Sequence, residues 1–451
     1  MPVKKNKLLV SVLSASLLFG SAGYTFVYAA PPAVSPQDQK VVARVDAARA
    51  IEHVRYLSEN IGSRPGGLQG EKKSAEYIAK TLKSYGYSVE YQYFPVADQY
   101  IAHVTLSNGS VWEMGAAPNG KISSTPVKAE VVYLENTDPE SLKNVQGKIV
   151  VVPRGNTTAS YQAQVKALAE AKAAGVILQS LVGSRGNYGQ AFNPSLPVKY
   201  DIPVFGASYI HGEWLKDEIS AGRKQISLTG QHFTNLQSVN VIAVKKAKSK
   251  NPEGKEVILG AHHDSVVGAP GANDNASGVG LMLELARVYK GYNTDKDLKF
   301  IAFGSEERGL LGARYYVDQL NQKQRDAIEA VFVPDMVATS YEKAKNLYAM
   351  TPDGSRNIVT DSAVAAGTRL GNSDILPGTF GSSDHVPFHN AGIPAALFIW
   401  MGVDSWNPLV YHIEKVYHTP QDTIADNVSH ERMQSALDII GSGLFDVVRK
   451  K

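Results

Sequence analysis

Short apolar segments alternate with segments of helical spacing through the second half of this 451-residue chain. The apolar run "KEVILGAHHD" is followed by "ASGVGLMLELARVYKGY", in which apolar residues recur every three or four positions. Strand-like and helix-like segments then keep alternating up to the closing helical segment "SHERMQSALDIIGSGLFDVVRK". Continuous apolar strands that alternate with helices are typical of a sheet buried on both faces. We therefore predict an α/β fold, with a mainly parallel mixed sheet sandwiched by helices.

A second kind of sequence interrupts the larger pattern between residues 98 and 232. It is richer in Val, Gly, Ser and Pro, and it holds short strands such as "GKIVVVPRG" and an Ala-rich helix that leads into "GVILQS". We predict a small α/β domain inserted between two strands of a larger one. The larger domain then has two parts, residues 30–97 and residues 233–451. Its first part has helical spacing over residues 41–59 and strand-like alternation in "SVEYQYFPV".

The first 29 residues differ in character from those that follow. "MPVKKNK" is basic, "LLVSVLSASLLFG" is apolar and "VYAA" offers small residues for cleavage, which is the three-part pattern of a secretory signal peptide. A membrane anchor is the alternative, but Ser and Gly interrupt the apolar run, and it falls short of the roughly 20 residues that a span needs. We therefore expect a secreted, extracellular protein without a membrane span.

Charge and cysteine content narrow the possible partners. The formal net charge is +3, and the leader carries three lysines and no acidic residue, so the remaining chain is near neutral. Nothing in this balance favours a nucleic acid or another polyanion. The chain has no cysteine, so disulfides are excluded. We expect a monomer that relies on its core and on bound metal.

Three of the apolar strands end in side chains of metal-ligand type. These are His262, His263 and Asp264 after the first strand, Glu306 and Glu307 after the second, and Asp335 after the third. In open α/β sheets, ligands bind outside the carboxyl ends of the strands. Strand-end polar residues can also simply cap turns and helices. Their occurrence at three strand ends favours a shared site, and Gly304 and Gly309 would let the backbone turn sharply on either side of the two glutamates.

The segment "HHD" suggests a ligand with its supporting carboxylate. Residues two apart on a strand share a face, so His262 and Asp264 point the same way. A metal-bound imidazole usually passes its other N–H to a carboxylate, which fixes its tautomer. His263 points to the opposite face, and we interpret it as a hydrogen-bonded structural histidine.

Three loops add further candidates. Asp274 in "GANDNASGVG" could cap the following helix or could present a carboxylate that bridges two cations. His418 lies in "VYHTPQDT", where a proline two residues later stiffens the loop. Asp384 and His385 in "GSSDHVPFHNAGIP" could contact substrate or make structural hydrogen bonds, and the sequence leaves both interpretations open.

Taken together and in order, "GAHHDS", "GANDNASG", "FGSEERGLLGA", "PDM" and "YHTPQD" resemble the secreted bacterial aminopeptidases with two co-catalytic zinc ions, of the bacillus type. The resemblance covers essentially all of the chain after the leader. The inserted segment is similar to the protease-associated domain that many members carry. Each motif alone is weak, whereas the ordered set is highly specific.

The resemblance implies a role for each residue that matches a family motif. The implied ligands of two zinc ions per chain are His262, Asp274, Glu307, Asp335 and His418. Asp274 would bridge both ions, and each zinc would have one histidine and two carboxylates, with a position left for water. Glu306 would be the general base. A cis peptide after Asp274 is also implied, and Tyr417, beside a ligand, is a candidate hydrogen-bond donor to the oxyanion.

The expected activity is a metallo-aminopeptidase that removes amino acids from peptides with free N-termini. A carboxypeptidase or dipeptidase on the same fold is one alternative, and a cyclotransferase of the glutaminyl cyclase type with a single zinc is another. A non-catalytic binding protein on this fold is the alternative from a different class. The complete set of five ligand positions, together with Glu306, argues against the last two. The preferred side chain, leucine-like or basic, stays open.

Overall fold

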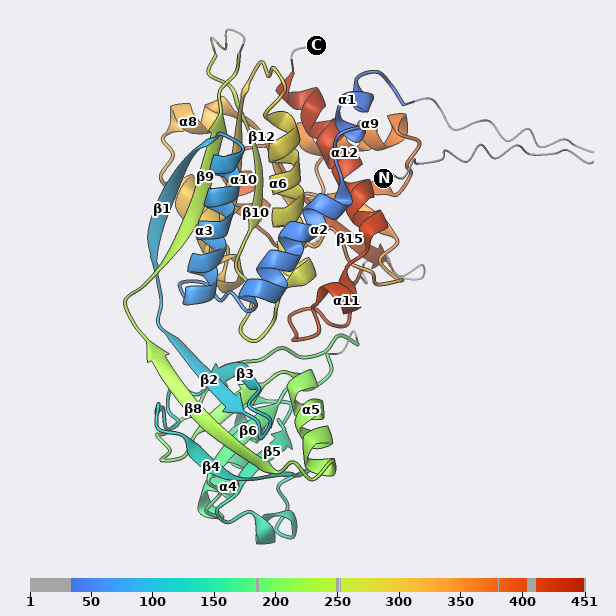
Figure 1. Ribbon diagram of the computed structural model, residues 1–451. Helices are drawn as coiled ribbons and strands as arrows, with labels where there is room; N and C mark the ends of the chain where they lie inside the picture. The colour runs from blue at the N-terminus through green and yellow to red at the C-terminus, as the bar shows by residue number, and fades with distance from the viewer. Residues whose placement is uncertain are drawn as a thin grey trace, which may run out of the picture. The chain divides into compact units, whose positions relative to one another are not determined.

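A nine-stranded mixed sheet forms the centre of the larger domain in this computed structural model (Figure 1). The structure describes residues 34–183, 186–248, 251, 253–379, 381–403 and 411–449, so the predicted leader lies outside the described residues. The strands are β1 (Ser88–Val96), β9 (Leu236–Lys245), β11 (Asp297–Phe303), β10 (Glu256–His262), β12 (Ile328–Pro334), β15 (Ala395–Val403), β13 (Asn346–Met350) and β14 (Ile375–Gly378), in sheet order, with β16 (Tyr411–His412) beside β15.

The middle of this sheet is parallel and its flanks contain antiparallel pairs. Strands β11, β10, β12 and β15 run parallel to one another. On one side, β9 is antiparallel to β11 and to β1. On the other side, β13 is antiparallel to β15. The predicted α/β class with a mixed sheet is confirmed, and its parallel centre is where the strand-end residues lie.

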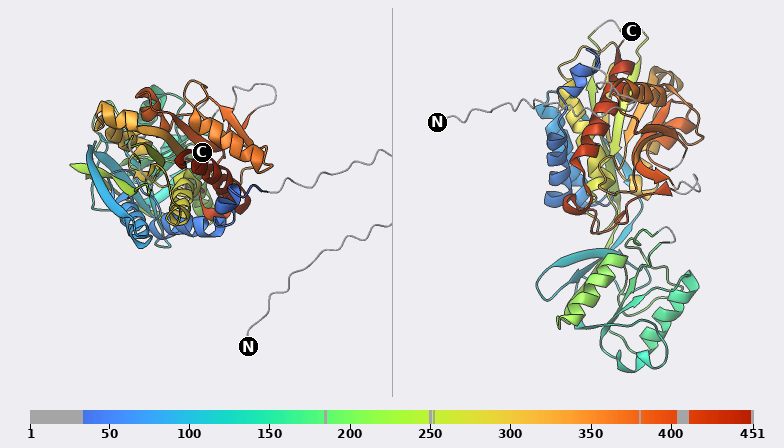
Figure 2. Two further views of the ribbon diagram at one scale, coloured as in Figure 1. Left: turned by 90° about the horizontal axis from the view of Figure 1, so that it is seen from above. Right: turned by 90° about the vertical axis from the view of Figure 1, so that its right-hand side faces the viewer.

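Helices cover both faces of the sheet (Figures 1 and 2). The helices of the larger domain are α1 (Asp38–Val42), α2 (Ala47–Arg55), α3 (Gln69–Ser84), α6 (Gly278–Tyr289), α7 (Leu311–Asp318), α8 (Gln322–Ala327), α9 (Ile358–Arg369), α10 (His385–Asn390), α11 (Ile424–Asn427) and α12 (His430–Val448). Along β10, Val257 and Leu259 join the core under α2, α3, α6 and α12, whereas Ile258 joins the core under α7 and α10. This alternation explains why the strand is apolar throughout.

The segment 41–59, which has helical spacing, does not form one helix. It divides into the end of α1, the helix α2 and most of the π-helical turn η1 (Tyr56–Ile61). The break comes at Asp46, whose extended backbone and carboxylate cap α2 by accepting a hydrogen bond from the N–H of Ala48 at 2.8 Å. An aspartate inside a helical pattern therefore acts here as a start signal.

Residues 99–233 form a closed seven-stranded barrel, which we call the inserted barrel. Its strands are β2 (Gln99–Thr105), β3 (Val111–Ala116), β7 (Val204–Ala207), β6 (Gly175–Gln179), β5 (Ile149–Pro153), β4 (Val127–Tyr133) and β8 (Gln225–Phe233), in barrel order. It also carries α4 (Thr158–Glu170) and α5 (Tyr209–Ser220). The predicted small α/β insertion is confirmed, although its closure into a barrel was not predicted. β1 leads into β2 and β8 into β9, so two short links join the barrel to the sheet (Figure 1).

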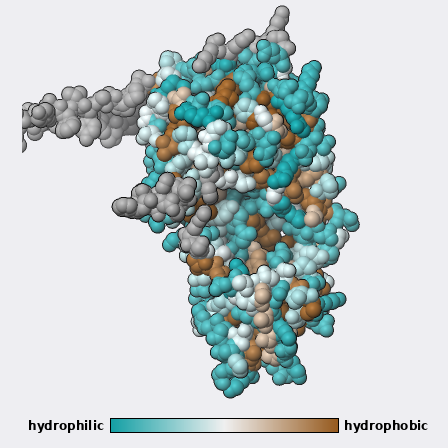
Figure 3. Space-filling model, turned by 180° about the vertical axis from the view of Figure 1, so that it is seen from behind, coloured by the Kyte–Doolittle hydropathy of each residue, from teal (hydrophilic) through white to brown (hydrophobic). Residues whose placement is uncertain are grey.

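The surface offers no evidence for a membrane-spanning helix. Within the described parts of the chain, no helix combines the length and the apolar character that crossing a bilayer requires. On the face seen in Figure 3, apolar residues are scattered among hydrophilic ones rather than gathered into one broad patch. Scattered apolar residues of this kind are normal on globular proteins.

Candidate metal centre

Three adjacent parallel strands deliver the predicted residues to one edge of the sheet. His262 is the last residue of β10, Asp335 directly follows β12, and Glu306 begins the short helix η4 (Glu306–Arg308) after β11. Because β11, β10 and β12 are parallel neighbours, their carboxyl ends meet. The two remaining residues come from loops, Asp274 from the irregular turn η3 (Ala272–Ser277) and His418 from the segment before α11.

The five predicted ligand residues form two sets that share Asp274. The Nε2 atom of His262 lies 3.2 Å from Asp274 Oδ1 and 3.4 Å from Asp335 Oδ1. The Nε2 atom of His418 lies 3.0 Å from Asp274 Oδ2 and 3.1 Å from Glu307 Oε2. Each set therefore contains one imidazole nitrogen and two carboxylates. Glu306 is close to the first set, since one of its carboxylate oxygens lies within 4.8 Å of a ligand atom of His262 and of Asp335.

The cluster has the donor chemistry and the unsatisfied atoms of a divalent-cation site. His262 is 1% exposed, Asp274 5% and Asp335 7%. In the described part of the chain, Glu307 Oε1, Asp335 Oδ1 and His418 Nε2 are buried without a hydrogen bond. Leaving such atoms buried without a partner is costly. Imidazole nitrogens and carboxylate oxygens are the ligands that zinc takes, so the residues present fit zinc ions.

The charges of the cluster lead to the same conclusion. Burial alone would lower the pKa of His262, but the neighbouring carboxylates, Asp335 first, raise it well above its ordinary value. The pKa of His418 is raised in the same way, chiefly by Glu307. Burial also raises the pKa of Glu307 to about 7 and that of Glu306 well above its usual range. An excess of buried negative charge of this kind calls for cations.

Asp264 connects the first imidazole to the turn that carries the two glutamates. Its Oδ1 atom lies 3.4 Å from Nδ1 of His262. Its carboxylate also accepts hydrogen bonds from the backbone N–H groups of Glu306, at 3.0 Å, and Glu307, at 3.2 Å. His263 faces away, and its Nε2 donates to the carbonyl of Val239 at 3.0 Å. The structure thus places Asp264 behind the site and His263 in the core, as the alternation along the strand predicted.

The turn around the glutamates is tight and strained. Ser305 and Leu310 have positive φ angles of 53° and 63°, and Gly309 has a φ of 102°. A Cβ atom on Gly304 would lie 2.4 Å from Ser238 Oγ, so only glycine fits there. Non-glycine residues in the left-handed region persist only where the surroundings hold them. The glycines therefore let the chain turn directly from the strand into the site.

A second acidic residue holds the loop of Asp274. The carboxylate of Asp422 accepts hydrogen bonds from the N–H groups of Asn273, at 2.9 Å, and Asp274, at 3.0 Å. The peptide bond between Asp274 and Asn275 is cis, as the resemblance implies. Asp274 lies between the two sets, and the structure gives it no helix-capping hydrogen bond among the described residues.

Three buried residues that the sequence did not single out hold the backbone around the site. Arg64 is fully buried, and its guanidinium donates to backbone carbonyls, including those of His263 at 3.0 Å and Gly271 at 3.0 Å. Glu71 accepts from the N–H of Ser305 at 2.9 Å. Asp422, the third, is the last residue of the motif "YHTPQD". Nothing in their local sequence indicated these contacts, because each partner is far away along the chain.

The loop of Asp384 and His385 is buried rather than open to substrate. Both residues are fully buried, and Ser383 donates from Oγ to Asp335 Oδ2 at 2.8 Å. Burial raises the pKa of Asp384 well above its ordinary value, and neighbouring carboxylates raise it further. Neither interpretation is confirmed, since the buried side-chain atoms of Asp384 and His385 make no hydrogen bond among the described residues.

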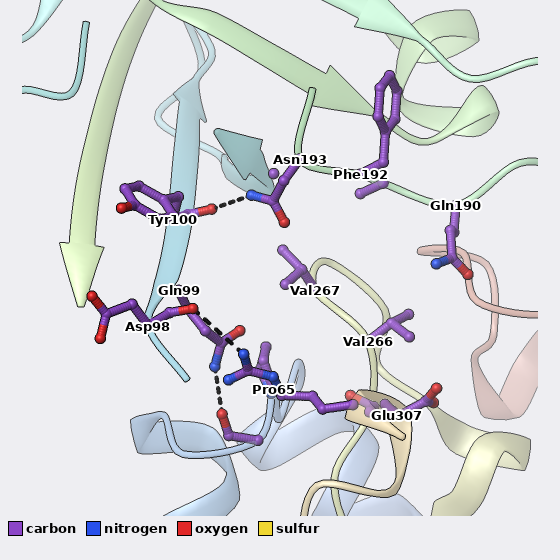
Figure 4. Close-up of a pocket in the computed structure, with 15 residues that line it drawn as sticks. Pro65, Asp98, Gln99, Tyr100, Gln190, Phe192, Asn193, Val266, Val267 and Glu307 are labelled. Carbon is purple, nitrogen blue, oxygen red and sulfur yellow. Dashed lines mark hydrogen bonds between the residues drawn. The ribbon is translucent and has the colours of Figure 1, made fainter. Parts of the chain in front are cut away.

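A cavity of about 480 Å³ opens beside Glu307, between the larger domain and the inserted barrel. Figure 4 shows Gln190, Phe192 and Asn193 of the barrel on one side of it, with Val266, Val267 and Glu307 of the larger domain opposite. A hydrogen bond from Asn193 to the carbonyl of Tyr100, at 2.7 Å, fixes part of its wall. The lining mixes apolar side chains such as Phe192 and Val267 with polar and charged ones, including Glu307 of the cluster. Binding sites for small substrates likewise place polar groups among apolar ones.

Comparisons with known proteins were consistent with the geometry. The family model described as "Peptidase family M28" matches residues 240–442, and the model described as "PA domain" matches residues 127–215. Aminopeptidase YwaD of Bacillus subtilis is 37% identical over 415 residues, which are 90% of this chain and 86% of that protein. A solved structure of BSAP, a zinc aminopeptidase from Bacillus subtilis, is 36% identical with a TM-score of 0.65, covering 90% of this chain and 96% of that one. An aminopeptidase from Aneurinibacillus sp. strain AM-1 is 34% identical with a TM-score of 0.58, covering 92% and 97%.

Proposed function

Because the chain belongs to peptidase family M28, we propose that it is a zinc aminopeptidase that removes N-terminal amino acids from peptides. The single observation that carries the proposal is the pair of ligand sets that share Asp274. Two cations held in this way can act together on one scissile bond.

The ligand assignment is part of the proposal. One zinc would be held by His262, Asp274 and Asp335, and the other by Asp274, Glu307 and His418. The contact distances in the two sets support this division. When bound, zinc supplies Lewis acidity that polarises the scissile carbonyl and acidifies water.

We assign proton transfer to Glu306. The proposed ligand sets leave its carboxylate uncoordinated, and its backbone N–H donates to Asp264. Burial raises its pKa well above the ordinary value, which makes the carboxylate a stronger base. The carboxylate would take a proton from the attacking water and deliver it to the peptide nitrogen as the C–N bond breaks.

Tyr417 stays a candidate for stabilising the oxyanion. Its ring stacks on that of His418, with centroids 3.7 Å apart and planes 22° apart. Burial and the nearby carboxylates, Asp274 first, raise its pKa well above the ordinary value, so its hydroxyl keeps the proton that it would donate.

The remaining features of the proposal concern the whole protein. We place the domain boundaries between residues 97 and 98 and between residues 232 and 233, since β2 begins at Gln99 and β8 ends at Phe233. Secretion rests on the leader pattern of residues 1–29, and we propose that the protein acts as an extracellular monomer on peptides with free N-termini.

A metal count combined with a substrate panel tests this function. We expect two zinc ions per chain and hydrolysis of aminoacyl chromogenic amides, with none of the same amides after N-acetylation. A strong chelator should abolish the activity, and added zinc should restore it. Cleavage of N-blocked peptides from their carboxyl end would favour a carboxypeptidase instead, and activity untouched by the chelator would rule out the metal mechanism.

A further inference from the structure

The two histidines of the cluster are supported by different parts of the chain. The Nδ1 atom of His262 faces Asp264, in the same strand-end segment, at 3.4 Å. The Nδ1 atom of His418 is hydrogen-bonded to the side-chain oxygen of Gln190, which belongs to the inserted barrel. We propose that Gln190 is a positioning residue for His418, so that the inserted barrel completes one of the two metal sites. This inference rests on the proposed two-zinc function.

The direction of the hydrogen bond defines the tautomer of His418. The amide oxygen of Gln190 can only accept, so the proton sits on Nδ1 of His418. The lone pair of Nε2 then points toward Asp274 and Glu307, which lie 3.0 and 3.1 Å away. A metal-binding histidine usually has this arrangement, in which the other ring nitrogen donates to an oxygen. Within the described residues, Gln190 is the hydrogen-bond partner that the structure gives to Nδ1.

The barrel segment that carries Gln190 is anchored on both domains. The N–H of Tyr188 donates to the carbonyl of Lys415 at 2.8 Å, three residues before His418. On the barrel side, Ser180 donates from Oγ to the carbonyl of Gln190 at 2.6 Å. Gly189 sits so close to Leu181 that an added Cβ would lie 2.4 Å from its carbonyl oxygen. These contacts hold Gln190 against His418 without help from the metal.

The two supports differ in charge and in position. Asp264 offers a buried carboxylate 3.4 Å from His262, whereas Gln190 offers a neutral amide on an exposed side chain beside the cavity. We therefore expect the zinc ion near His418, and not the one near His262, to depend on the inserted barrel.

Zinc affinity measured by competition with a chelator tests the role of Gln190. Gln190→Leu keeps the size of the side chain and removes the acceptor, so it should weaken one of the two zinc ions about 10- to 100-fold and leave the other unchanged. Gln190→Glu keeps an acceptor oxygen and should bind both ions at least as tightly as the natural chain. Gln162→Leu is the matched control, since Gln162 lies on α4 of the same barrel and donates to Ser195 instead.

The outcomes separate this inference from the proposed function. If the natural chain binds two zinc ions and Gln190→Leu binds both equally well, the role of Gln190 is wrong and the function stands. If Gln190→Glu bound zinc as weakly as Gln190→Leu, the role of Gln190 would also be wrong, because an acceptor oxygen would then not improve zinc affinity. If the natural chain binds no zinc, the proposed function itself fails. Gln190 is exposed, so the variants should fold, and near-ultraviolet circular dichroism checks this.

Discussion

The central sheet and the inserted barrel are built from similar elements, but they differ in the number of acidic side chains that they bury. Both contain parallel strands followed by helices. At the strand ends of the sheet, the carboxylates of Asp264 and Asp335 are buried. Among the described residues of the barrel, the buried polar side chains are Gln179, Ser180, Ser208 and His211, with no acid.

The buried polar residues of the barrel are mostly satisfied by their neighbours. Gln179, for example, accepts from the hydroxyl of Tyr133 at 2.9 Å and donates to Glu213 at 2.8 Å. Glu113, Arg154 and His211 of the barrel each keep one buried atom without a hydrogen bond among described residues. In the larger domain, the unsatisfied atoms of Glu307, Asp335 and His418 belong to one cluster of possible metal ligands. Architecture alone therefore does not create a site. The gathering of such side chains at the strand ends distinguishes the sheet from the barrel.

The largest effect should come from Glu306, the proposed general base at the edge of the sheet. Glu306→Gln removes the proton acceptor without changing the shape, so turnover should fall by roughly a thousandfold or more, while both zinc ions stay bound. Steady-state kinetics and a metal count check this. Glu135→Gln in the barrel, whose side chain is 72% exposed, is the control and should keep normal turnover. Near-normal turnover of Glu306→Gln would mean that the base lies elsewhere.

A smaller effect is expected from the carboxylate behind the first histidine. Asp264→Asn removes the negative charge that faces His262. The same charge strengthens the hydrogen bonds that Asp264 accepts from the N–H groups of Glu306 and Glu307. Zinc affinity should fall about 10- to 100-fold, measured by chelator competition. Unchanged zinc content after long dialysis would count against a supporting role for Asp264.

Competition between protons and zinc for the two histidines should make metal binding depend on pH. Both ligand histidines must be neutral to bind metal, and neighbouring carboxylates raise the pKa of His262 and His418 above the ordinary value, against the effect of burial. Zinc affinity should therefore decline as the pH falls, starting above pH ~6.5, by about tenfold per pH unit for each histidine that must lose its proton. Affinity that stays constant between about pH 8 and pH 6 would contradict this assignment of the ligands.

The smallest effect on turnover should come from the core of the barrel. Phe205 and Phe300 are fully buried, one in β7 of the barrel and the other in β11 of the sheet. Truncating either to alanine should cost about 3–5 kcal/mol of stability. At low temperature, Phe205→Ala should keep turnover within about twofold of that of the natural chain. Phe300→Ala should lower turnover as well as stability, because β11 leads directly into the turn that holds Glu306. Denaturant unfolding and kinetics measure both, and equal losses of turnover would remove the distinction between the regions.

Much of the arrangement could be predicted because it depends on residues close together in the chain. The strand β1, Ser88–Val96, coincides with the alternating segment "SVEYQYFPV". The five candidate ligands were named from strand ends and from short motifs, and the structure brings all of them together. The helix predicted over residues 41–59 was wrong in its continuity, since the cap at Asp46 outweighed the periodicity.

The rest required the folded chain. By itself, the sequence determined which segments are strands or helices and which side chains could bind metal, because periodicity and residue type are local properties. Only the tertiary structure decided which groups hold those side chains in place: Glu71 meets Ser305 from 234 positions away, and Gln190 meets His418 from 228. Contacts over such separations depend on how whole elements pack, and no short stretch of residues carries that information.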